Sequence, residues 1–460
     1  MLRNYIGNKG FYKRVFLLAI PMIIQNTVTN FVSLLDNIMV GQLGTAQMSG
    51  VSIVNQLIFI FNLAIFGISA GAGVFTAQFH GAKDTDGVRH TMRYRLMASV
   101  VMTGIFLVTL SFFQDDLIRL FLQGDGSAEE AARFLSYGKD YLFVMMFGLL
   151  PFAISGAYSG TLRESGQTFV PMVAGTVAVF VNLSLNYVLI FGHLGLPAMG
   201  VKGAALATVI SRYVEMAIVT LWTHLHPKRN PFVRGLFKSL YIPFSLLKKL
   251  ALKGLPLLCN EVLWSFAITF MTQRYSTRGL DVVSALNMTS TINNLSNVVT
   301  LTLGSVTGIL LGQMIGAGQS IKAVRAESKK LMFLSLCAGT VFGGMLISIS
   351  GLYPQLYNVD DSIRQMTASM IFIIALFKPV MGLVHSCYNT IRAGGKTWMT
   401  FINDSGFMWC VSAPLAFCLT QFTDIPILPI YFLCQVPEIL KLVMSFFILR
   451  TDAWMQNLTK

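Results

Sequence analysis

Long apolar runs without a charged residue recur along the whole chain. A membrane-spanning helix needs about 20 predominantly apolar residues, so the longest of these runs must each hold a span and an uncharged loop. A membrane β-barrel would instead show short segments of alternating polarity. Examples of runs without any Lys, Arg, Asp or Glu are Val15–Leu35, Asn37–Ala82, Ser165–Val201, Val282–Ile321 and Leu331–Val359.

The pattern predicts an all-α polytopic membrane protein with twelve transmembrane helices. Their boundaries follow from where the apolar runs begin and end, and charged or Gly- and Pro-containing segments separate them. The expected spans are at about residues 15–40, 48–79, 94–114, 132–157, 168–191, 203–223, 250–274, 283–312, 330–353, 365–391, 398–419 and 426–449.

One stretch of the chain occurs twice. A shift of 235 positions, without a gap, superimposes residues that shape the backbone: Pro21 on Pro256, Gly44 on Gly279, Gly73 on Gly308 and Gly81 on Gly316. A second similarity, at a shift of 229, places Thr161–Thr168 on Thr390–Thr397. Repeats of this size are typical of secondary transporters. We therefore expect two pseudo-symmetric six-helix bundles: an amino-terminal lobe at 1–223, a linker at 224–247 and a carboxy-terminal lobe at 248–460.

The composition supports a membrane protein and excludes several other classes. Charged residues make up only 12% of the chain, against roughly a quarter in soluble domains. The net charge of +14 fits the topology below, so we expect no nucleic-acid partner. The six cysteines lie in apolar runs without CxxC spacing, which predicts neither disulfides nor a metal centre. No metal spacing, nucleophile motif or phosphate loop is present, so we expect no enzyme and no cofactor.

Loop charges give the expected orientation. With the amino terminus inside, seven inner segments hold 24 of the 34 basic residues. This is the positive-inside pattern, and it places both termini in the cytoplasm of a multi-pass plasma (inner) membrane protein. No small-residue cleavage site follows the first basic residues, so we expect no removable signal peptide. Acidic residues gather in the outer loops: Asp115, Asp116, Asp125, Glu129, Glu130, Asp360, Asp361 and Asp424.

Charged residues inside the spans need an explanation, because each costs about 2.5–3.5 kcal/mol at the membrane centre. Arg212 with Glu215, and Glu438 with Lys441, are three residues apart and are expected to pair within a helix. Four others have no such neighbour: Asp36, Glu261, Lys378 and Asp404. The sequence leaves two interpretations open for these four, which are buried structural pairs or caps, and cation or proton binding.

Two further polar residues share one face of the fifth span. Asn182 and Asn186 are four residues apart in an apolar helix, where buried amides need partners. They can form an interhelical hydrogen-bond pair. Together with Asp36 they can also supply the oxygen ligands that a hard cation such as Na⁺ needs.

These residues, in this order, resemble the multidrug and toxic compound extrusion (MATE) family. The resemblance covers about residues 10–450 and includes the early Pro21, the Gln78–Gly81 end of span two, and these segments: Asp36–Gly44, Asn182-xxx-Asn186, Asn260–Trp264 and Arg392–Thr397. It implies a monomeric exporter with two six-helix lobes, driven by Na⁺ or H⁺ entry, that expels cationic or amphipathic small molecules.

The resemblance also assigns roles to individual residues. It implies that Asp36 and Asn182 form the cation site of the amino-terminal lobe, and that Glu261 is the acidic residue of span seven. Two departures matter: Asn186 stands where the family usually has Asp, and span ten offers Lys378 in place of an acidic residue. The first departure favours protons over Na⁺, and the second puts the second ion site in doubt. Glu261 and Lys378 are both expected near mid-depth in one bundle, without an opposite charge one helical turn away, so we predict an ion pair between them.

Two other functions were compared with export. A flippase for lipid-linked saccharides on a related architecture would need several cavity arginines for phosphates. The unpaired intramembrane charges here are three acids and one lysine, which disfavours it. A membrane enzyme or receptor lacks support from any motif. The sequence therefore predicts a secondary active antiporter in which Asp36, Asn182, Asn186 and Glu261 serve ion coupling. Lys378 and Asp404 are secondary charges of the cavity.

Overall fold

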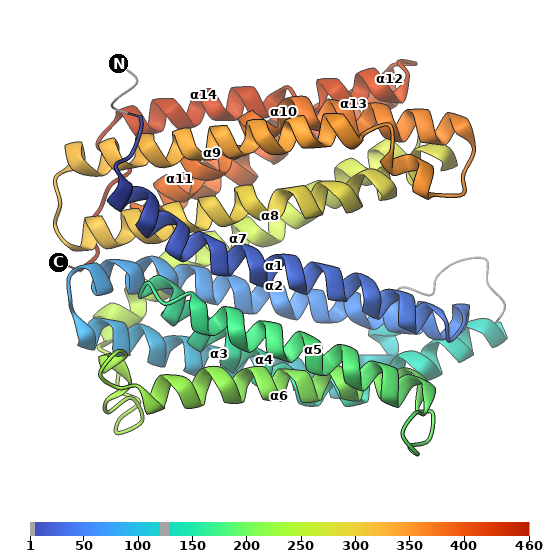
Figure 1. Ribbon diagram of the computed structural model, residues 1–460, viewed down its shortest axis with the longest axis horizontal. Helices are drawn as coiled ribbons and strands as arrows, with labels where there is room; N and C mark the ends of the chain where they lie inside the picture. Colours follow the sequence, from blue (N-terminus) through green and yellow to red (C-terminus); the bar gives the residue numbers. More distant parts are fainter. Residues whose placement is uncertain (1–4, 120–127, 460) are drawn as a thin grey trace. The chain divides into compact units, whose positions relative to one another are not determined.

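The computed structural model describes residues 5–119 and 128–459 and is built from helices (Figure 1). The first half contains α1 (Lys9–Gly41), α2 (Thr45–Gly81), α3 (Thr85–Arg119), α4 (Ala128–Glu164), α5 (Phe169–Phe191), α6 (Gly200–Leu225) and the short turn η2 (Pro231–Val233). The second half contains α7 (Phe244–Ser276), α8 (Leu280–Gly316), α9 (Ile321–Ile349), η3 (Tyr353–Leu356), α10 (Asp361–Ala393), α11 (Thr397–Phe401), the π-helical turns η4 (Ile402–Gly406) and η5 (Met408–Ser412), α12 (Ala413–Phe422), α13 (Ile427–Leu433) and α14 (Pro437–Arg450).

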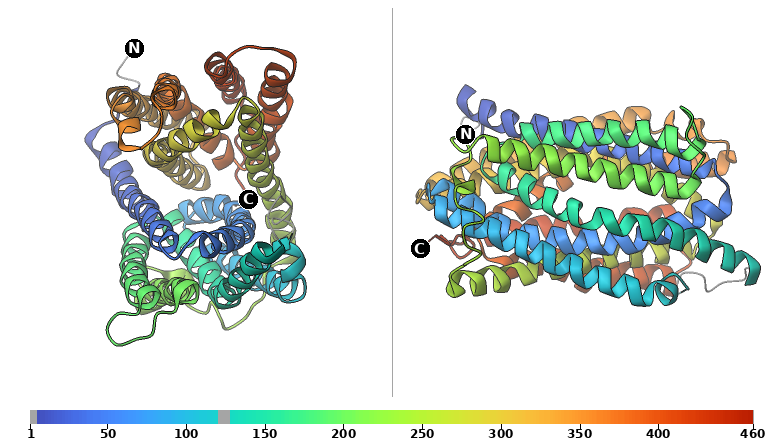
Figure 2. Two further views of the ribbon diagram at one scale, coloured as in Figure 1. Left: turned by 90° about the vertical axis from the view of Figure 1, so that its right-hand side faces the viewer. Right: turned by 90° about the horizontal axis from the view of Figure 1, so that it is seen from below.

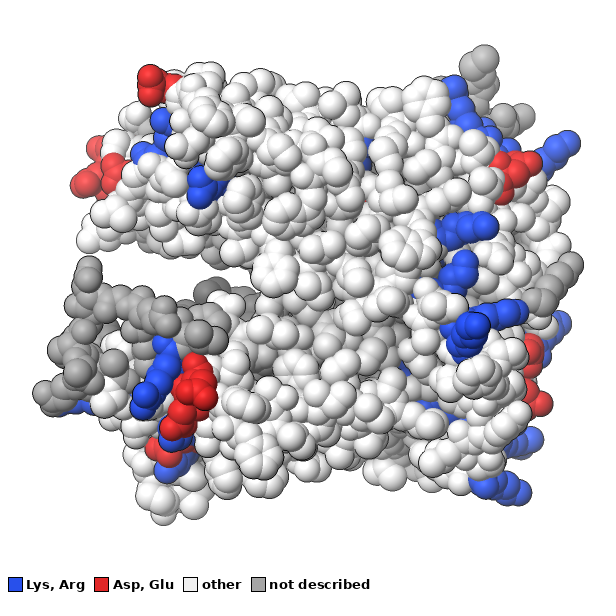
Figure 3. Space-filling view, turned by 180° about the vertical axis from the view of Figure 1, so that it is seen from behind, with Lys and Arg blue, Asp and Glu red and all other residues white. Residues whose placement is uncertain are grey.

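The twelve predicted spans are confirmed. Twelve helical segments of the described chain are long and apolar enough to cross a membrane, with α11 to α12 forming one and α13 to α14 another. Most helices extend beyond the predicted spans at one or both ends. In Figure 3 the middle of the helices is almost free of charged side chains. Lys and Arg gather mainly at one end, and acidic residues are mixed with basic ones at the other.

The chain divides into two compact units. One unit contains residues 20–76 and 85–248, and the other contains residues 1–19, 77–84 and 249–460. The division differs from the expected lobe boundary in that the start of α1 and the last turns of α2 cluster with the carboxy-terminal residues. Each unit is described separately below, as the amino-terminal and the carboxy-terminal unit.

In the amino-terminal unit α4 packs against α3 and α6, and α5 packs against α6 (Figures 1 and 2). Its core joins large side chains such as Phe61 and Leu142 to small ones such as Ala153 and Ala205. Gly203 on α6 lies so close to α5 that a Cβ atom would approach the Leu189 carbonyl oxygen to 2.5 Å. Small residues at such crossings let membrane helices approach closely.

In the carboxy-terminal unit α10 is central and packs against α8, α9 and α14. Gly339 and Gly343 on α9 face α10 at the Lys378–Pro379 step, where a Cβ atom at Gly339 would lie 2.6 Å from the Lys378 carbonyl oxygen. Proline lacks the N–H group that would bond to the helix four residues earlier. The two α9 glycines therefore let α9 and α10 approach closely at Lys378.

The structure reproduces the repeat in its backbone turns. Gly44 and Gly279 have φ angles of 122° and 130°, and Gly166 and Gly395 have φ angles of 83° and 75°. At the ends of α2 and α8, Lys83 and Gly318 occupy equivalent positions with φ angles of 60° and 73°. Close contacts there are reciprocal: Gly81 packs on the Gln313 backbone, and Gly316 packs on the Gln78 backbone. A Cβ atom at either glycine would come within 2 Å of a carbonyl oxygen, at 1.9 and 1.8 Å respectively.

The predicted linker, residues 224–247, is tied to the amino-terminal unit. The guanidinium of Arg93 on α3 donates to the carbonyl oxygens of Gly235, Leu236 and Tyr241 at 2.7, 2.9 and 3.0 Å. Among the residues used for the orientation prediction, Arg3, Asp125 and Lys460 lie outside the described residues, and so do the side chains of Glu129 and Glu130.

Candidate functional site

The amino-terminal unit brings Asp36, Asn182 and Asn186 together, although α1 and α5 lie far apart in sequence. Asn186 Nδ2 donates to Asp36 Oδ1 at 2.7 Å and lies 3.2 Å from Asn182 Oδ1. Both amides are buried, at 6% and 2% exposure, whereas Asp36 is half-buried. Because residues four apart share a face of a helix, α5 presents both amides to one carboxylate.

Thr208 on α6 completes this cluster. Its hydroxyl lies 3.2 Å from Asn182 Nδ2 and also donates to the Ala204 carbonyl oxygen. Turning the Asn182 amide by half a rotation would let its nitrogen donate to both Asp36 oxygens, at 3.0 and 2.9 Å, and its oxygen accept from Thr208. Amide orientation is assigned from such networks, and this orientation satisfies more groups. With the Asn182 amide turned in this way, the Asp36 carboxylate accepts hydrogen bonds from the amide nitrogens of both Asn182 and Asn186.

One acceptor of the cluster is left over. Asn186 Oδ1 is buried and has no hydrogen-bond partner in the described chain. A buried polar atom without a partner is costly, and a functional role or a bound water or ion is among its explanations. Oxygen atoms of Asp36, Asn182, Asn186 and Thr208 could serve Na⁺, but the amide nitrogens would first have to turn away from the carboxylate.

A second charge lies near Asp36. The predicted pair on α6 is present, with Arg212 Nη1 and Glu215 Oε2 3.3 Å apart. The Arg212 guanidinium also lies over the Phe152 ring, 4.8 Å from its centre, and acts electrostatically on Asp36. The pairing with Glu215 was predicted from spacing, but the proximity of Arg212 to Asp36 was not.

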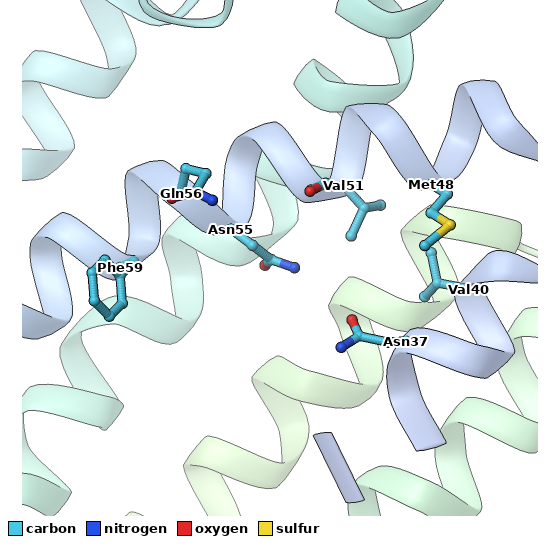
Figure 4. Close-up of a pocket in the computed structure, with 8 residues that line it drawn as sticks. Asn37, Val40, Met48, Val51, Asn55, Gln56 and Phe59 are labelled. Atoms are coloured by element: carbon cyan, nitrogen blue, oxygen red, sulfur yellow. The ribbon is translucent and has the colours of Figure 1, made fainter. Parts of the chain in front are cut away.

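The amino-terminal unit also contains a cavity of about 570 Å³. One of its lining residues is Asn37, which directly follows Asp36 in the chain. Ligand pockets for drug-sized molecules fall in the range of about 300–1,000 Å³. Asn37 and Asn55 supply amides to its lining, and Met48 and Phe59 supply adaptable apolar surface (Figure 4). Its residues come from α1 and α2: Asn37, Val40, Met48, Val51, Ser52, Asn55, Gln56 and Phe59. Amides beside apolar groups suit amphipathic molecules.

Lys378 in the carboxy-terminal unit is fully buried and does not pair with Glu261. Its Nζ atom donates to Asn293 Oδ1 and Asn297 Oδ1 on α8, at 2.7 and 2.6 Å. The predicted Glu261–Lys378 ion pair is therefore wrong. Glu261 interacts with Tyr388 and Arg392, which lie ten and fourteen residues beyond Lys378 on α10. At about 1.5 Å per residue, ten residues separate the two levels by about 15 Å. Both residues are near the middle of their helices but not at the same depth.

Asp404 forms a buried ion pair, which is one of the two interpretations that the sequence left open for it. Lys441 Nζ on α14 lies 2.7 Å from Asp404 Oδ1 and 3.7 Å from Glu438 Oε1. Lys441 thus belongs first to Asp404 and only secondarily to Glu438, its expected partner. Asn260 Nδ2 on α7 donates to Asp404 Oδ2 at 3.0 Å. This network holds η4, a π-helical turn, and π-helical turns frequently occur at functional sites.

Glu261 is half-buried on α7 beside this network. Its electrostatic neighbours are Arg392, Asp404 and the hydroxyl of Tyr388. Asn260, the residue before it, also lies 3.3 Å from that hydroxyl and connects it to Asp404. Glu261 and Asp404 therefore belong to one cluster, and Lys378 belongs to another.

Sequence analysis missed several members of these clusters. The Asn293–Asn297 pair has the same spacing as Asn182–Asn186, and the rule that selected the first pair would have selected the second. Thr208 and the Lys441–Asp404 pair carry no such signal, because the partners lie on different helices. Within the described residues no group of three or more His, Cys, Asp or Glu could hold a metal ion.

Twelve spans in two repeated halves, with polar clusters inside apolar bundles, define a polytopic membrane transporter. The model of the MatE family matches residues 21–188 and 257–418, so the chain belongs to the MatE family.

Curated relatives and solved structures agree. A protein of Thermotoga maritima described as probable multidrug resistance protein NorM is 26% identical over 432 residues, covering 93% of this chain and 90% of the relative. Probable multidrug resistance protein YoeA of Bacillus subtilis is 24% identical over 428 residues, with coverages of 91% and 89%.

Two crystal structures share the fold. One is of MATE in the bent conformation, with a TM-score of 0.85, 19% identity and coverages of 98% and 96%. The other is of a mutant of the Vibrio cholerae MATE transporter VcmN, with a TM-score of 0.84, 17% identity and coverages of 97% and 99%. The twelve-helix fold is thereby confirmed, and the family is one of transporters.

Proposed function

We propose that this protein is a secondary active antiporter that exports cationic or amphipathic small molecules in exchange for H⁺ or Na⁺. The observation that carries the proposal is the Asp36 cluster, a half-buried carboxylate inside the helix bundle that is bonded at 2.7 Å to Asn186. A carboxylate there can bind a proton or a cation. The MatE match and the multidrug relatives favour export over the flippase alternative.

Exchange follows from competition for one negative charge. When Asp36 is ionised, it attracts an organic cation from the cavity that Asn37 and Asn55 line. Binding of H⁺ or Na⁺ neutralises the carboxylate and releases that cation. The amide nitrogens that face Asp36 disfavour Na⁺, because Na⁺ needs oxygen ligands and the amides would first have to turn.

The conformational part of the proposal is alternating access. The two repeat halves, residues 1–223 and 248–460, rock relative to each other while each bundle stays nearly rigid. The positive-inside pattern supports an inner-membrane orientation with both termini in the cytoplasm. We infer that the protein acts as a monomer, as the family resemblance implies. Glu261 serves ion or proton coupling in the carboxy-terminal half, and Lys378 and Asp404 are its secondary charges.

The test is efflux from proteoliposomes with separately imposed pH and Na⁺ gradients. A fluorescent organic cation serves as the substrate, and empty liposomes serve as the control. We expect the pH gradient to drive efflux and an equal Na⁺ gradient to add little. Efflux that ignores both gradients would contradict antiport. Efflux driven by Na⁺ alone would contradict the preference for H⁺.

A further inference from the structure

The segment that follows α14, residues 451–459, is seated in the carboxy-terminal unit rather than extending into solvent. Trp454 is 0% exposed and Leu458 is 7% exposed. Two adjacent glycines after α10 accept these side chains. A Cβ atom at Gly394 would lie 2.1 Å from the Trp454 carbonyl oxygen, and one at Gly395 would lie 2.8 Å from the Leu458 side chain. We call this segment the strap; it leaves α14 in red in Figure 1.

Backbone bonds hold the strap to the end of α10. Gln456 N donates to the Gly394 carbonyl oxygen at 2.8 Å, and Met455 forms an antiparallel bridge with Gly395. Because Gly395 has a φ of 75°, and any side chain there would collide with Leu458, glycine is required for this seat.

Gln78, at the end of α2, uses both ends of its amide on the strap. Its Oε1 atom accepts from Leu458 N at 2.7 Å, and its Nε2 atom donates to the carbonyl oxygens of Gln456 and Ala393 at 3.2 and 2.9 Å. Gln78 is 0% exposed, so these bonds replace water entirely. The strap therefore bonds the end of α2 to the end of α10.

Three more helices contact the strap. Asn457 Nδ2 donates to the Ile315 carbonyl oxygen at the end of α8, at 3.1 Å. Lys253 Nζ on α7 donates to Gln456 Oε1 at 3.2 Å. Arg325 on α9 lies 2.8 Å from Asp452 Oδ1. The strap thus contacts the ends of α2 and α8, where Gly81 of α2 and Gly316 of α8 each pack on the backbone of the other helix.

The seat is nevertheless incomplete in one respect. Trp454 Nε1 is buried and has no hydrogen-bond partner in the described chain. A buried indole N–H normally finds a partner, and leaving it unpaired costs about 1–3 kcal/mol.

We propose that the strap is a releasable lock that holds the ends of α2, α8 and α10 together, and that it must leave its seat for this end of the transporter to open. The inference rests on the alternating access proposed above, because only a cycle that opens this end requires release. The lock stabilises the conformation with this end closed and delays the return step.

The first experiment prevents release in the full chain reconstituted into proteoliposomes. The double variant Lys253→Cys/Gln456→Cys is treated with a short bifunctional maleimide, which links the strap to α7. We expect cross-linking to reduce efflux at least tenfold relative to the untreated double variant. The single variants Lys253→Cys and Gln456→Cys receive the same reagent and control for modification of the six native cysteines. Undiminished efflux from the cross-linked protein, with efflux by the wild type, overturns the lock and leaves the proposed function intact.

The second experiment measures release without relying on efflux. Leu458→Cys in nanodiscs is labelled with a soluble maleimide, with and without substrate and across pH and Na⁺ conditions. The exposed Thr451→Cys and the buried native Cys387 set the upper and lower rates. We expect labelling at position 458 to rise above that of Cys387 when the protein cycles, and Gln78→Ala to raise it further. Labelling that stays at the Cys387 rate under every condition overturns the lock, even if the wild type shows no ion-driven efflux.

Discussion

The two units use one structural device with opposite polarity. In the amino-terminal unit an asparagine pair four residues apart on α5 presents an amide nitrogen to the carboxylate of Asp36. In the carboxy-terminal unit a pair with the same spacing on α8 presents two amide oxygens to the ammonium of Lys378. An amide carries both a donor and an acceptor, so the same residue pair can accommodate either charge. The charged partner, not the amide pair, decides what each site can bind.

The sites also differ in how completely they are closed. Lys378 is 0% exposed and has two short hydrogen bonds, whereas Asp36 is half-buried beside an acceptor without a partner in the described chain. A fully buried, doubly bonded group is suited to holding helices in place, and a half-buried group is suited to exchanging a ligand. We therefore assign exchange to Asp36 and regard Lys378 as a tethered cation that fixes α10 to α8.

The largest effect expected is on transport, from Asp36→Asn. The substitution keeps the shape of the side chain but removes the charge for which substrate and ion compete. We expect ion-driven efflux to fall to the level of empty liposomes while folded yield is unchanged. Asp115→Asn, which removes an exposed carboxylate near Lys139, is the matched control and should retain efflux. Wild-type efflux from the Asp36 variant would show that exchange occurs elsewhere, and the contrast between the units would then lose its basis.

The second largest effect is on stability, from Asp404→Asn in the carboxy-terminal unit. Lys441 is 4% exposed and would be left without its nearest carboxylate. Removing one partner of a buried ion pair costs about 3–5 kcal/mol, because the remaining charge is uncompensated. The double variant Asp404→Asn/Lys441→Met should recover much of the folded yield. A thermal unfolding series in detergent checks this, and purely additive losses would show that the two side chains are not coupled.

Most of the fold was predictable from the sequence, because membrane spans are long and apolar and loop charges separate them. The repeat was also predictable, since Gly44 and Gly279, or Gly166 and Gly395, occupy turns that require positive φ. Residues 1–19 and 77–84 cluster with the unit that contains residues 249–460, and no local pattern of the sequence encodes such packing.

The candidate sites were predictable in part. Asp36, Asn182 and Asn186 were grouped correctly because two of them share a helix face and the third is the only charge in its span. The Glu261–Lys378 pair failed because a position along a span gives depth only to within several residues, and α10 alone separates the two levels by about 15 Å. The Lys441–Asp404 pair could not be found, since spacing identifies partners on one helix and not on two.

The third prediction applies one substitution to both units. Asn297→Asp places a carboxylate beside the Lys378 ammonium, so it should stabilise the protein. Asn186→Asp places a carboxylate beside Asp36, so it should destabilise the protein through like-charge repulsion. We expect shifts of about 1–3 kcal/mol in opposite directions, the range of hydrogen bonds to charged groups. Unfolding midpoints at neutral pH without Na⁺ measure both.

The same pair of variants distinguishes ligands. The loss of stability caused by Asn186→Asp should be reversed by Na⁺ or by acid, because either neutralises one of two adjacent carboxylates. The same variant should raise the Na⁺ dependence of efflux. The gain in stability caused by Asn297→Asp should not depend on Na⁺. Equal responses of the two variants would contradict the opposite polarity of the two sites.

The smallest effect concerns the repeat-related turns at the ends of α2 and α8. Lys83 has a φ of 60°, and Gly318 occupies the equivalent position with a φ of 73°. A non-glycine residue in this left-handed region costs about 1–2 kcal/mol. Both positions are exposed, and a Cβ atom at Gly318 would meet nothing within 4 Å, so backbone conformation alone should decide the outcome. We expect Lys83→Gly to stabilise the protein by about 1 kcal/mol and Gly318→Ala to destabilise it by a similar amount. Lys83→Ala, which removes the charge but keeps the strain, separates the two causes. If Lys83→Ala stabilises as much as Lys83→Gly, loss of the charge rather than relief of the backbone explains the gain, and the two turns are not energetically equivalent.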